Sequence, residues 1–486
     1  MTRNCDVVLV NPDIGFDITK YSTKPNLPNA ILCVGTALHL AGYNVKLIDQ
    51  RVEKDWQQKL LEVLGTDVIC VGISSMTGAQ IRNGLQVARI VRSHSDRPIV
   101  WGGIHPTLLA EQTLQHTCVD IVVRGEGEET IVELVQALRR NLSLGGIRGI
   151  SYKENGTIYQ NPPRPFIDLD RQPPLAYELL EMSNYLADYQ GYKAADFMTS
   201  RGCPFDCGYC YASAFHSRKW RATSVDNVLN KLKVLIDRYG VRRFWFDDDD
   251  FFTDMNRARE LLEAFTQLNI RWESRGARVD TVLRMDDRFL ELLQRSGCVR
   301  LAVGAESGSN RILKLIKKRI QREDIVAANR KLARYPLYVR YNFMLGFPTE
   351  TREEVKETVA LALQLKRENP QAMFSAFAMF TPYPGCELHD LAVEHGLKRP
   401  SSLEEWAGFQ FHIDNTAWVP REMRGMLQML AFATPFLNEP VETHPPFLIK
   451  LLAKAYQPLA RQRIAHGFFR FPLEILIAKV LRLYEN

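Results

Sequence analysis

Short apolar runs alternate with longer helical patterns through the first 140 residues of the chain. The apolar runs are four to six residues long, which is typical of strands, and they occupy residues 6–10, 45–48, 68–73, 98–101 and 120–123. The helical pattern at residues 30–41 stops at Gly42, a residue that commonly caps a helix. Because strands that alternate with helices predict βαβ units, we expect a doubly wound, Rossmann-like α/β domain over residues 1–145.

Prolines then interrupt the alternation. Proline fits neither a helix interior nor a central strand, so we expect a proline-rich linker over residues 146–192. The prolines that define it are Pro162, Pro163, Pro165, Pro173 and Pro174.

Longer strand and helix units follow the linker. The strand-like runs occupy residues 197–200, 242–246, 270–274, 299–303, 338–345 and 373–379. Six such units predict a partial (β/α)₆ barrel over residues 193–388 rather than the full eight-unit barrel. The pattern then becomes mainly helical and aromatic, which predicts a small helical C-terminal region over residues 389–486.

The loops after the strands are the expected ligand sites. In doubly wound sheets, ligands bind beyond the carboxyl ends of the strands. The loops at residues 11–15, 74–78, 102–107 and 124–129 should therefore share one edge of the first domain, and catalytic groups of the barrel should follow its strands.

Composition limits the partners. Lys and Arg number 62 against 56 Asp and Glu, and the resulting charge of +6 over 486 residues is too mild to indicate nucleic acid. Acidic residues interrupt the N-terminus before a signal-peptide core could form, and no apolar run is long enough for a spanning helix. We therefore expect a cytoplasmic protein that does not span a membrane.

The chain has nine cysteines, and six of them lie singly in apolar surroundings, where a buried thiol is the ordinary role. The other three, Cys203, Cys207 and Cys210, fall within eight residues after the first barrel strand. Three thiolates can hold an iron–sulfur cluster and leave one iron open to a substrate or cofactor. The alternatives are a structural zinc site completed by His216, or three unrelated buried thiols.

The loop from Cys203 to Cys210, with an aromatic residue before its last cysteine, resembles the signature of radical S-adenosylmethionine (SAM) enzymes. The resemblance implies a partial (β/α)₆ barrel and a 4Fe–4S cluster held by the three cysteines, with SAM on the fourth iron. An electron from the cluster would then cleave SAM to methionine and a 5′-deoxyadenosyl radical.

Motifs after the later barrel strands resemble the same family in order and placement. The resemblance implies that SAM contacts Tyr209, Asp248, Asp249, Arg275, Glu306, Ser307 and Gly346. The alternatives are a solvated acidic run at residues 247–250, a structural ion pair at Arg275 and a helix cap at Ser307.

The first domain has no GxGxxG motif after its first strand and no P-loop, which argues against a dinucleotide or ATP. Its loops resemble the cobalamin-binding domain that is commonly fused to radical SAM barrels. The resemblance implies cobalamin contacts from Ser74, Met76, Thr77, Gly102, Gly103, His105, Gly125 and Glu126. Ala37 stands where the cobalt-ligating motif of many cobalamin proteins has Asp, so His39 is interpreted as a packing residue and the axial ligand stays open.

Two of these residues have ordinary alternatives. His105 could stabilise a turn, and Glu126 could cap the helix that follows it.

In the C-terminal region, apolar residues at 473, 476, 477, 480 and 483 share one face of a predicted helix. The helix could pack on the barrel, or it could make a peripheral contact with a membrane or a lipid-like substrate. Aromatic residues could line a substrate cavity or a core; these are Trp406, Phe409, Phe411 and Trp418.

Together these features predict a cobalamin-dependent radical SAM methyltransferase of the class B type, using the 4Fe–4S cluster, SAM and cobalamin. It would methylate an unactivated carbon of a small-molecule or lipid-like substrate, with electrons from a partner such as flavodoxin or ferredoxin. One alternative is an oxidative cyclase or rearrangement enzyme with the same cofactors. Another is a non-catalytic cobalamin or iron–sulfur sensor.

Overall fold

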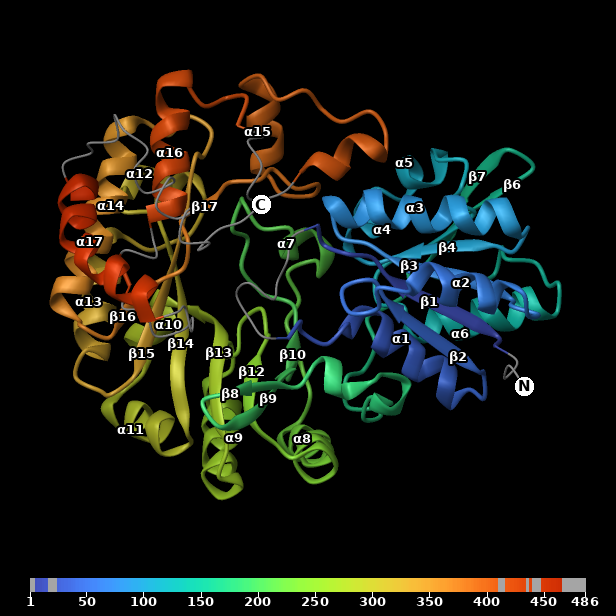
Figure 1. Ribbon diagram of the computed structural model, residues 1–486, viewed down its shortest axis with the longest axis horizontal. Helices are drawn as coiled ribbons and strands as arrows, with labels where there is room; N and C mark the ends of the chain where they lie inside the picture. Colours follow the sequence, from blue (N-terminus) through green and yellow to red (C-terminus); the bar gives the residue numbers. More distant parts are fainter. Residues whose placement is uncertain (1–4, 16–23, 410–415, 434–436, 439–446, 466–486) are drawn as a thin grey trace.

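Two α/β bodies lie side by side in the molecule, and a C-terminal region extends over one end of both (Figure 1). The computed structural model describes residues 5–15, 24–409, 416–433, 437–438 and 447–465. Each body contains one large sheet. The predicted fold class is confirmed: a doubly wound domain precedes a partial barrel, and helices follow.

The N-terminal sheet has seven strands in the order β2-β1-β3-β4-β5-β6-β7. Its five parallel strands begin within two residues of their predicted positions: β1 Val7–Asn11, β2 Val45–Asp49, β3 Cys70–Ser74, β4 Ile99–Gly102 and β5 Ile121–Val123. Helices α1 and α6 pack on one face of the sheet, and α2, α3 and α5 pack on the other. The helices are α1 Asn29–Leu40, α2 Trp56–Leu64, α3 Ala79–His94, α4 Ile104–Leu108, α5 Ala110–Gln115 and α6 Glu128–Arg139.

An antiparallel hairpin that the pattern did not predict extends this sheet. Its strands are β6 (Ile150–Glu154) and β7 (Thr157–Gln160), and β6 pairs with β5. β7 is the edge strand and is mostly exposed, so it lacks the apolar run that marks a central strand. Beyond it, the proline-rich segment contains two short 3₁₀ turns, η2 Tyr177–Leu179 and η3 Met182–Asn184, and then the first strand of the barrel sheet, β8 (Ala187–Tyr189).

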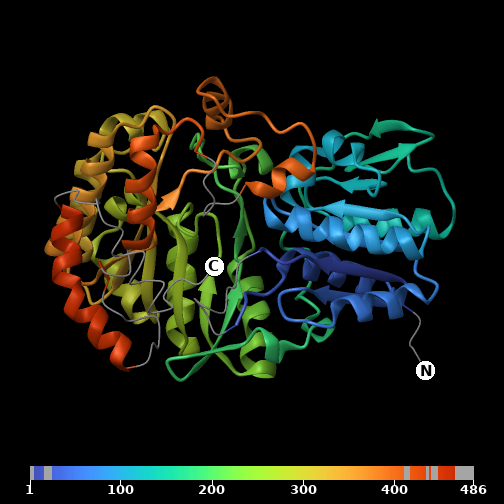
Figure 2. The ribbon, with the colours of Figure 1, turned by 45° about the horizontal axis from the view of Figure 1, so that its top comes forward.

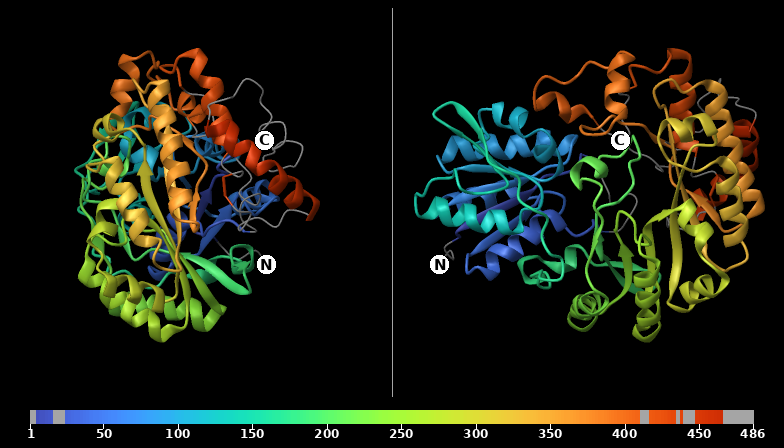
Figure 3. Two further views of the ribbon diagram at one scale, coloured as in Figure 1. Left: turned by 90° about the vertical axis from the view of Figure 1, so that its left-hand side faces the viewer. Right: turned by 180° about the vertical axis from the view of Figure 1, so that it is seen from behind.

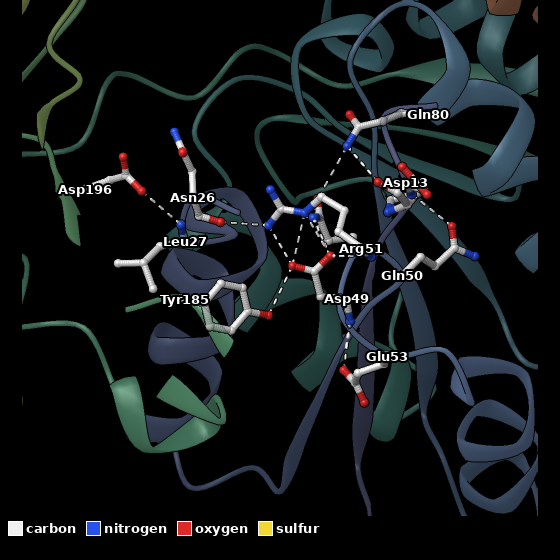
Figure 4. Close-up of polar contacts among 12 residues, drawn as sticks. Asp13, Asn26, Leu27, Asp49, Gln50, Arg51, Glu53, Gln80, Tyr185 and Asp196 are labelled. Atoms are coloured by element: carbon white, nitrogen blue, oxygen red, sulfur yellow. Dashed lines mark hydrogen bonds and ion pairs between the residues drawn. The ribbon is translucent and has the colours of Figure 1, made fainter. Parts of the chain in front are cut away.

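A buried polar cluster joins the N-terminal body, the linker and the barrel (Figure 4). The Asp49 carboxylate, at the end of β2, pairs with Arg51 at 2.6 Å and accepts a hydrogen bond from the Tyr185 hydroxyl at 3.1 Å. Nearby, the backbone N–H of Leu27 donates to the Asp196 carboxylate of the barrel at 3.2 Å. Because these contacts are buried and link residues of the N-terminal body to the linker and to the barrel, they help to hold the two bodies in one relative position.

The barrel sheet has the order β16-β15-β14-β13-β12-β9-β8, with β17 paired to β15. Only β8 runs antiparallel to its neighbour. The strands are β8 Ala187–Tyr189, β9 Tyr192–Phe197, β12 Val241–Phe246, β13 Arg271–Arg278, β14 Cys298–Glu306, β15 Tyr338–Leu345, β16 Ala372–Phe374 and β17 Ala378–Met379. A separate two-stranded ladder pairs β10 (Ser200–Arg201) with β11 (Arg221–Ala222).

Helices cover the convex side of the curled sheet, as the other views show (Figures 2 and 3). They are α8 Val225–Tyr239, α9 Met255–Leu268, α10 Val279–Arg284, α11 Asp287–Arg295, α12 Asn310–Leu315, α13 Arg322–Leu332 and α14 Arg352–Glu368. The short helix α7 (Ala212–Phe215) lies instead between the two bodies, against α4. The first barrel strand ends earlier than predicted. The Asp248 carboxylate accepts hydrogen bonds from the backbone and hydroxyl of Thr199, at 3.1 and 2.8 Å, and so draws the chain out of the sheet after Phe197.

The C-terminal region is mainly helical, as predicted, with α15 Leu388–Glu394, η4 Glu404–Gly408, α16 Arg421–Ala433 and α17 Phe447–Ala465. Trp406 and Phe409 are buried in the core that the N-terminal body forms with this region. Phe411 and the predicted helix at residues 473–483 lie outside the described residues. None of the described helices is long and apolar enough to cross a bilayer.

Candidate functional site

A cavity of about 370 Å³ lies between the carboxyl edge of the N-terminal sheet and the barrel. From the N-terminal body, Ser74, residues 102–104 and residues 125–128 line it, so three of the four loops predicted to share an edge meet there. From the barrel, Met198, residues that flank the cluster loop, such as Arg201 and Tyr211, and the acidic residues Asp247 and Asp249 contribute the opposite wall. A ligand in this cavity would contact both bodies at once.

Backbone forms much of the N-terminal wall. Gly103 has a φ of 97°, and a Cβ atom there would lie 2.8 Å from the Ser75 carbonyl oxygen. A Cβ at Gly72 would lie 2.5 Å from the Leu9 side chain. Only glycine fits at position 103, and a side chain at position 72 would require Leu9 to move; the absence of side chains at both positions leaves room for a large ring such as a corrin.

The structure divides the predicted cobalamin residues into two groups. Ser74, Gly102, Gly103, Gly125 and Glu126 line the cavity. The other three residues are not part of its described lining; they are Met76, Thr77 and His105.

His105 and Thr77 contact each other instead. The Thr77 hydroxyl lies 2.9 Å from His105 Nδ1, and the His105 ring is fully buried against Trp406. Burial lowers the pKa of His105 to about 3, so the ring is neutral at physiological pH. Met76 has 48% of its surface exposed. These positions agree with a turn-stabilising role for His105.

The three cysteines of the motif lie on the loop between β10 and α7, and none forms a disulfide. Gly202, just before Cys203, has a φ of 86°, and a Cβ there would lie 2.2 Å from the Lys219 carbonyl oxygen. Burial raises the pKa of Cys203 to about 12 and that of Cys210 to about 11, so both are neutral thiols until a metal displaces their protons.

Three thiols on one loop suit an iron–sulfur cluster, because they leave one iron open. No group of three His, Cys, Asp or Glu side chains among the described residues converges as one ion would require. His216, the proposed fourth zinc ligand, instead lies with its Nε2 3.6 Å from an Asp249 carboxylate oxygen. The Arg278 guanidinium is 3.6 Å from Cys207 Sγ, where it would stabilise a thiolate.

The acidic tract after β12 splits into separate roles. Asp248 is buried and accepts hydrogen bonds from Thr199 and Ser200. Its burial raises its pKa to about 6. Asp249 accepts from the Gly202 backbone N–H at 2.9 Å and lines the cavity. Asp248 therefore supports the base of the cluster loop, whereas Asp249 is placed to meet a ligand.

Tyr209, Glu306 and Lys318 form a second polar group beside the cluster loop. The Tyr209 hydroxyl donates to Glu306 at 3.0 Å, and the Lys318 ammonium pairs with the same carboxylate oxygen at 2.8 Å. The family resemblance predicts that Tyr209 and Glu306 contact SAM. It gave no signal for Lys318, because a lysine twelve residues beyond Glu306 belongs to no motif.

The remaining predicted SAM residues lie apart from this group. Arg275 pairs with Asp247 at 2.9 Å. The Ser307 hydroxyl is fully buried and contacts Thr358 of α14 at 3.2 Å. Gly346, with a φ of 78°, accepts from the Trp418 indole at 2.8 Å through its carbonyl.

Glu126 of the N-terminal body clamps both ends of the cluster-bearing segment. Arg201 pairs with one of its carboxylate oxygens at 3.0 Å, and Arg221 pairs with the other at 2.8 Å. Arg201 also pairs with Glu128 at 2.8 Å. Because Arg201 and Arg221 face each other across the β10–β11 ladder, one carboxylate fixes the start and the end of the loop that carries the cysteines.

Two family models match the chain: the radical SAM superfamily over residues 197–362 and the B12 binding domain over residues 23–135. An uncharacterized methyltransferase of Pyrococcus horikoshii is 36% identical over 361 residues, which cover 73% of this chain and 76% of that protein. The anaerobic magnesium-protoporphyrin IX monomethyl ester cyclase of Rubrivivax gelatinosus is 28% identical, over 69% of this chain and 60% of that protein. The chain belongs to the radical SAM superfamily, among the members that carry a B12-binding domain.

Solved structures share the whole architecture. The radical SAM methyltransferase TsrM of Kitasatospora setae, with cobalamin and a 4Fe–4S cluster bound, superposes with a TM-score of 0.69 at 16% identity and covers 99% of both chains. The cobalamin-dependent radical enzyme OxsB, with aqua-cobalamin and SAM bound, gives 0.72 at 18% identity over 99% of this chain and 75% of that chain. The protein is thus a radical SAM enzyme, and the predicted cofactors, a 4Fe–4S cluster, SAM and cobalamin, are confirmed.

Proposed function

We propose that the protein methylates an unactivated carbon of a small-molecule or lipid-like substrate. The observation that carries this proposal is the cavity that the glycine-rich edge and the cluster-loop side of the barrel line together. A substrate there would lie within reach of both a corrin on one wall and SAM on the other. The relative in Pyrococcus horikoshii, which bears the name methyltransferase, supports the same reaction class.

The residues of the chain have distinct parts in this reaction. Cys203, Cys207 and Cys210 would hold the cluster, and the Tyr209–Glu306 pair would orient SAM beside it. When bound, the cluster supplies the electron that cleaves SAM, and cobalamin supplies the methyl group. The two walls of the cavity would hold the reacting carbon between the bodies, and a flavodoxin or ferredoxin would deliver the electrons.

A second candidate is an oxidative cyclase with the same cofactors. The likeness to the Rubrivivax gelatinosus cyclase favours it, although the chain covers only 60% of that protein. The two functions differ in whether a methyl group leaves SAM for cobalamin and then for the substrate.

An isotope experiment separates them. The anaerobic, iron-reconstituted protein is given cobalamin, a strong reductant, a mixture of cell metabolites and SAM with a CD₃ methyl group. A methyltransferase should place CD₃ on the cobalamin and on one metabolite, and mass spectrometry against unlabelled SAM identifies both. Formation of 5′-deoxyadenosine with no CD₃ on either would reject methyl transfer and favour the cyclase; reactions without reductant are the control.

A further inference from the structure

Arginine side chains gather on the inner face of the barrel sheet. Along β15, Val339, Tyr341 and Phe343 are buried toward the helices, and the Tyr341 hydroxyl donates to Asn329 of α13. Arg340 lies between Val339 and Tyr341 in the strand and is partly exposed. Because successive side chains of a strand point to opposite faces, Arg340 points into the barrel.

Arg243 of β12 and Arg300 of β14 belong to the same interior, and they share one carboxylate. Glu273 of β13, which is almost fully buried, pairs with Arg243 at 2.8 Å and accepts from Arg300 Nε at 2.6 Å. The Trp245 indole also donates to Glu273 at 2.9 Å. The Glu273 carboxylate therefore pairs with the guanidinium groups of both Arg243 and Arg300.

Arg275 of β13 lies between two carboxyl groups, Asp247 at 2.9 Å and Asp196 at 3.5 Å. Asp196 is the barrel residue that also accepts from the Leu27 backbone (Figure 4). Burial, and then the charge of Asp196, raises the pKa of Asp247 to about 7, and burial raises the pKa of Asp196 as well. The two carboxyl groups therefore carry fewer than two negative charges at neutral pH.

Arg340 has no carboxylate partner among the residues that the structure describes. Burial, followed by the charge of Arg300, lowers the pKa of Arg340 to about 10. The nearby carboxyl groups are already engaged: Glu273 pairs with Arg243 and Arg300, and Asp247 and Asp196 lie beside Arg275. An unpaired cation in such surroundings gains strongly from an incoming anion.

We propose that Arg340, with Arg275 beside it, binds an oxyanion of the substrate, a carboxylate or a phosphate group, at the floor of the barrel. The planar guanidinium fork matches either group with two parallel hydrogen bonds. Asp247, the partner of Arg275, lines the interdomain cavity, so a substrate held at its anionic end would extend toward that cavity. This inference rests on the proposed function, because it requires the substrate to enter the barrel.

The test uses the holoenzyme with cluster, SAM and cobalamin, and titrates it calorimetrically with pyrophosphate and, separately, with malonate at constant ionic strength. Wild type should bind one equivalent of at least one probe, and the Arg340→Gln variant should bind it at least about tenfold more weakly. Preference for one probe tells phosphate from carboxylate. The Arg242→Gln variant is the matched control, because Arg242 is exposed on the same strand as Arg243, and its affinity should equal that of wild type.

Equal affinity in wild type and Arg340→Gln, or no binding of either probe by wild type, would overturn the inference. If Arg340→Gln does not fold, Arg340→Lys replaces it; lysine keeps the charge but not the fork, and binding should weaken several-fold. The outcome is separable from the methylation test. Anion binding that depends on Arg340, without CD₃ transfer, would support the anion site and reject the methyltransferase. CD₃ transfer together with wild-type anion affinity in Arg340→Gln would support the methyltransferase and reject the anion site.

Discussion

Replacing Cys203, Cys207 or Cys210 with alanine should remove the 4Fe–4S cluster and lower 5′-deoxyadenosine formation by about a thousandfold or more. The three thiols lie on one short loop, and two remaining thiolates cannot hold the iron while one site stays open to SAM. Iron content and visible absorption report the cluster. Mass spectrometry of an anaerobic reaction with SAM and a strong reductant reports 5′-deoxyadenosine.

Cys118→Ala is the control for this prediction. Cys118 is buried in the core of the N-terminal body, in a cluster of apolar residues distinct from the one that contacts the cluster loop. Its loss should cost stability by only about 1 kcal/mol and leave iron content unchanged. A motif variant that keeps both its iron and its SAM cleavage would show that the cluster is held elsewhere.

Glu126→Gln should destabilise the protein more than any exposed charge change, by about 3 kcal/mol. The substitution leaves Arg201 and Arg221, whose side chains are 20% and 19% exposed, without the carboxylate they share. The midpoint of anaerobic thermal unfolding should fall by about 5 °C. Cluster content should fall too, because the clamp holds both ends of the cysteine loop.

The clamp has a matched control three residues further along the chain. Glu129 lies in the first turn of α6, and its carboxylate, 54% exposed, reaches Arg164 only at 3.4 Å. Glu129→Gln should therefore shift stability by no more than about 0.5 kcal/mol. If Glu126→Gln unfolds at the wild-type temperature but binds cobalamin more weakly, then Glu126 contacts the cofactor directly, as its place in the cavity also allows.

The same clamp should weaken in acid. Burial alone would raise the pKa of Glu126, but Arg201 and Arg221 outweigh it and lower the pKa below its usual 4.5. A carboxyl group with a lowered pKa in the folded state contributes stability above its unfolded pKa and loses it as the pH falls through the folded pKa. The difference between wild type and Glu126→Gln should thus be full at neutral pH and shrink below about pH 4.5.

Sequence alone predicted the parts of the fold that depend on local pattern. Four of the five parallel strands of the N-terminal sheet, β1, β3, β4 and β5, are buried on both faces, so each appears as a mainly apolar run. The β6–β7 hairpin was missed because its outer strand is exposed and carries no such run. The first barrel strand was placed too late because its end depends on Asp248, a residue almost fifty positions away.

The candidate site divides in the same way. The cysteines were predictable because all three belong to one loop and their spacing is the signal. The ion pairs of Glu126 with Arg201 and Arg221 join residues 75 and 95 positions apart, and no local pattern marks them. The resemblance assigned Arg275 to SAM and Glu126 to cobalamin, and the structure adds that each also pairs with a partly buried charged side chain.

The sequence by itself determined the class of the two bodies, the cluster loop and the cofactors, because apolar periodicity and motif spacing are properties of neighbouring residues. Only the tertiary structure decided which charges meet. It set Glu126 beside both ends of the cluster-bearing segment, brought Lys318 to Glu306, and left Arg340 inside the barrel with no carboxylate partner in the described part of the chain. The reason is physical: an ion pair depends on distance in space, and distance between residues far apart in the chain exists only after the sheets have formed.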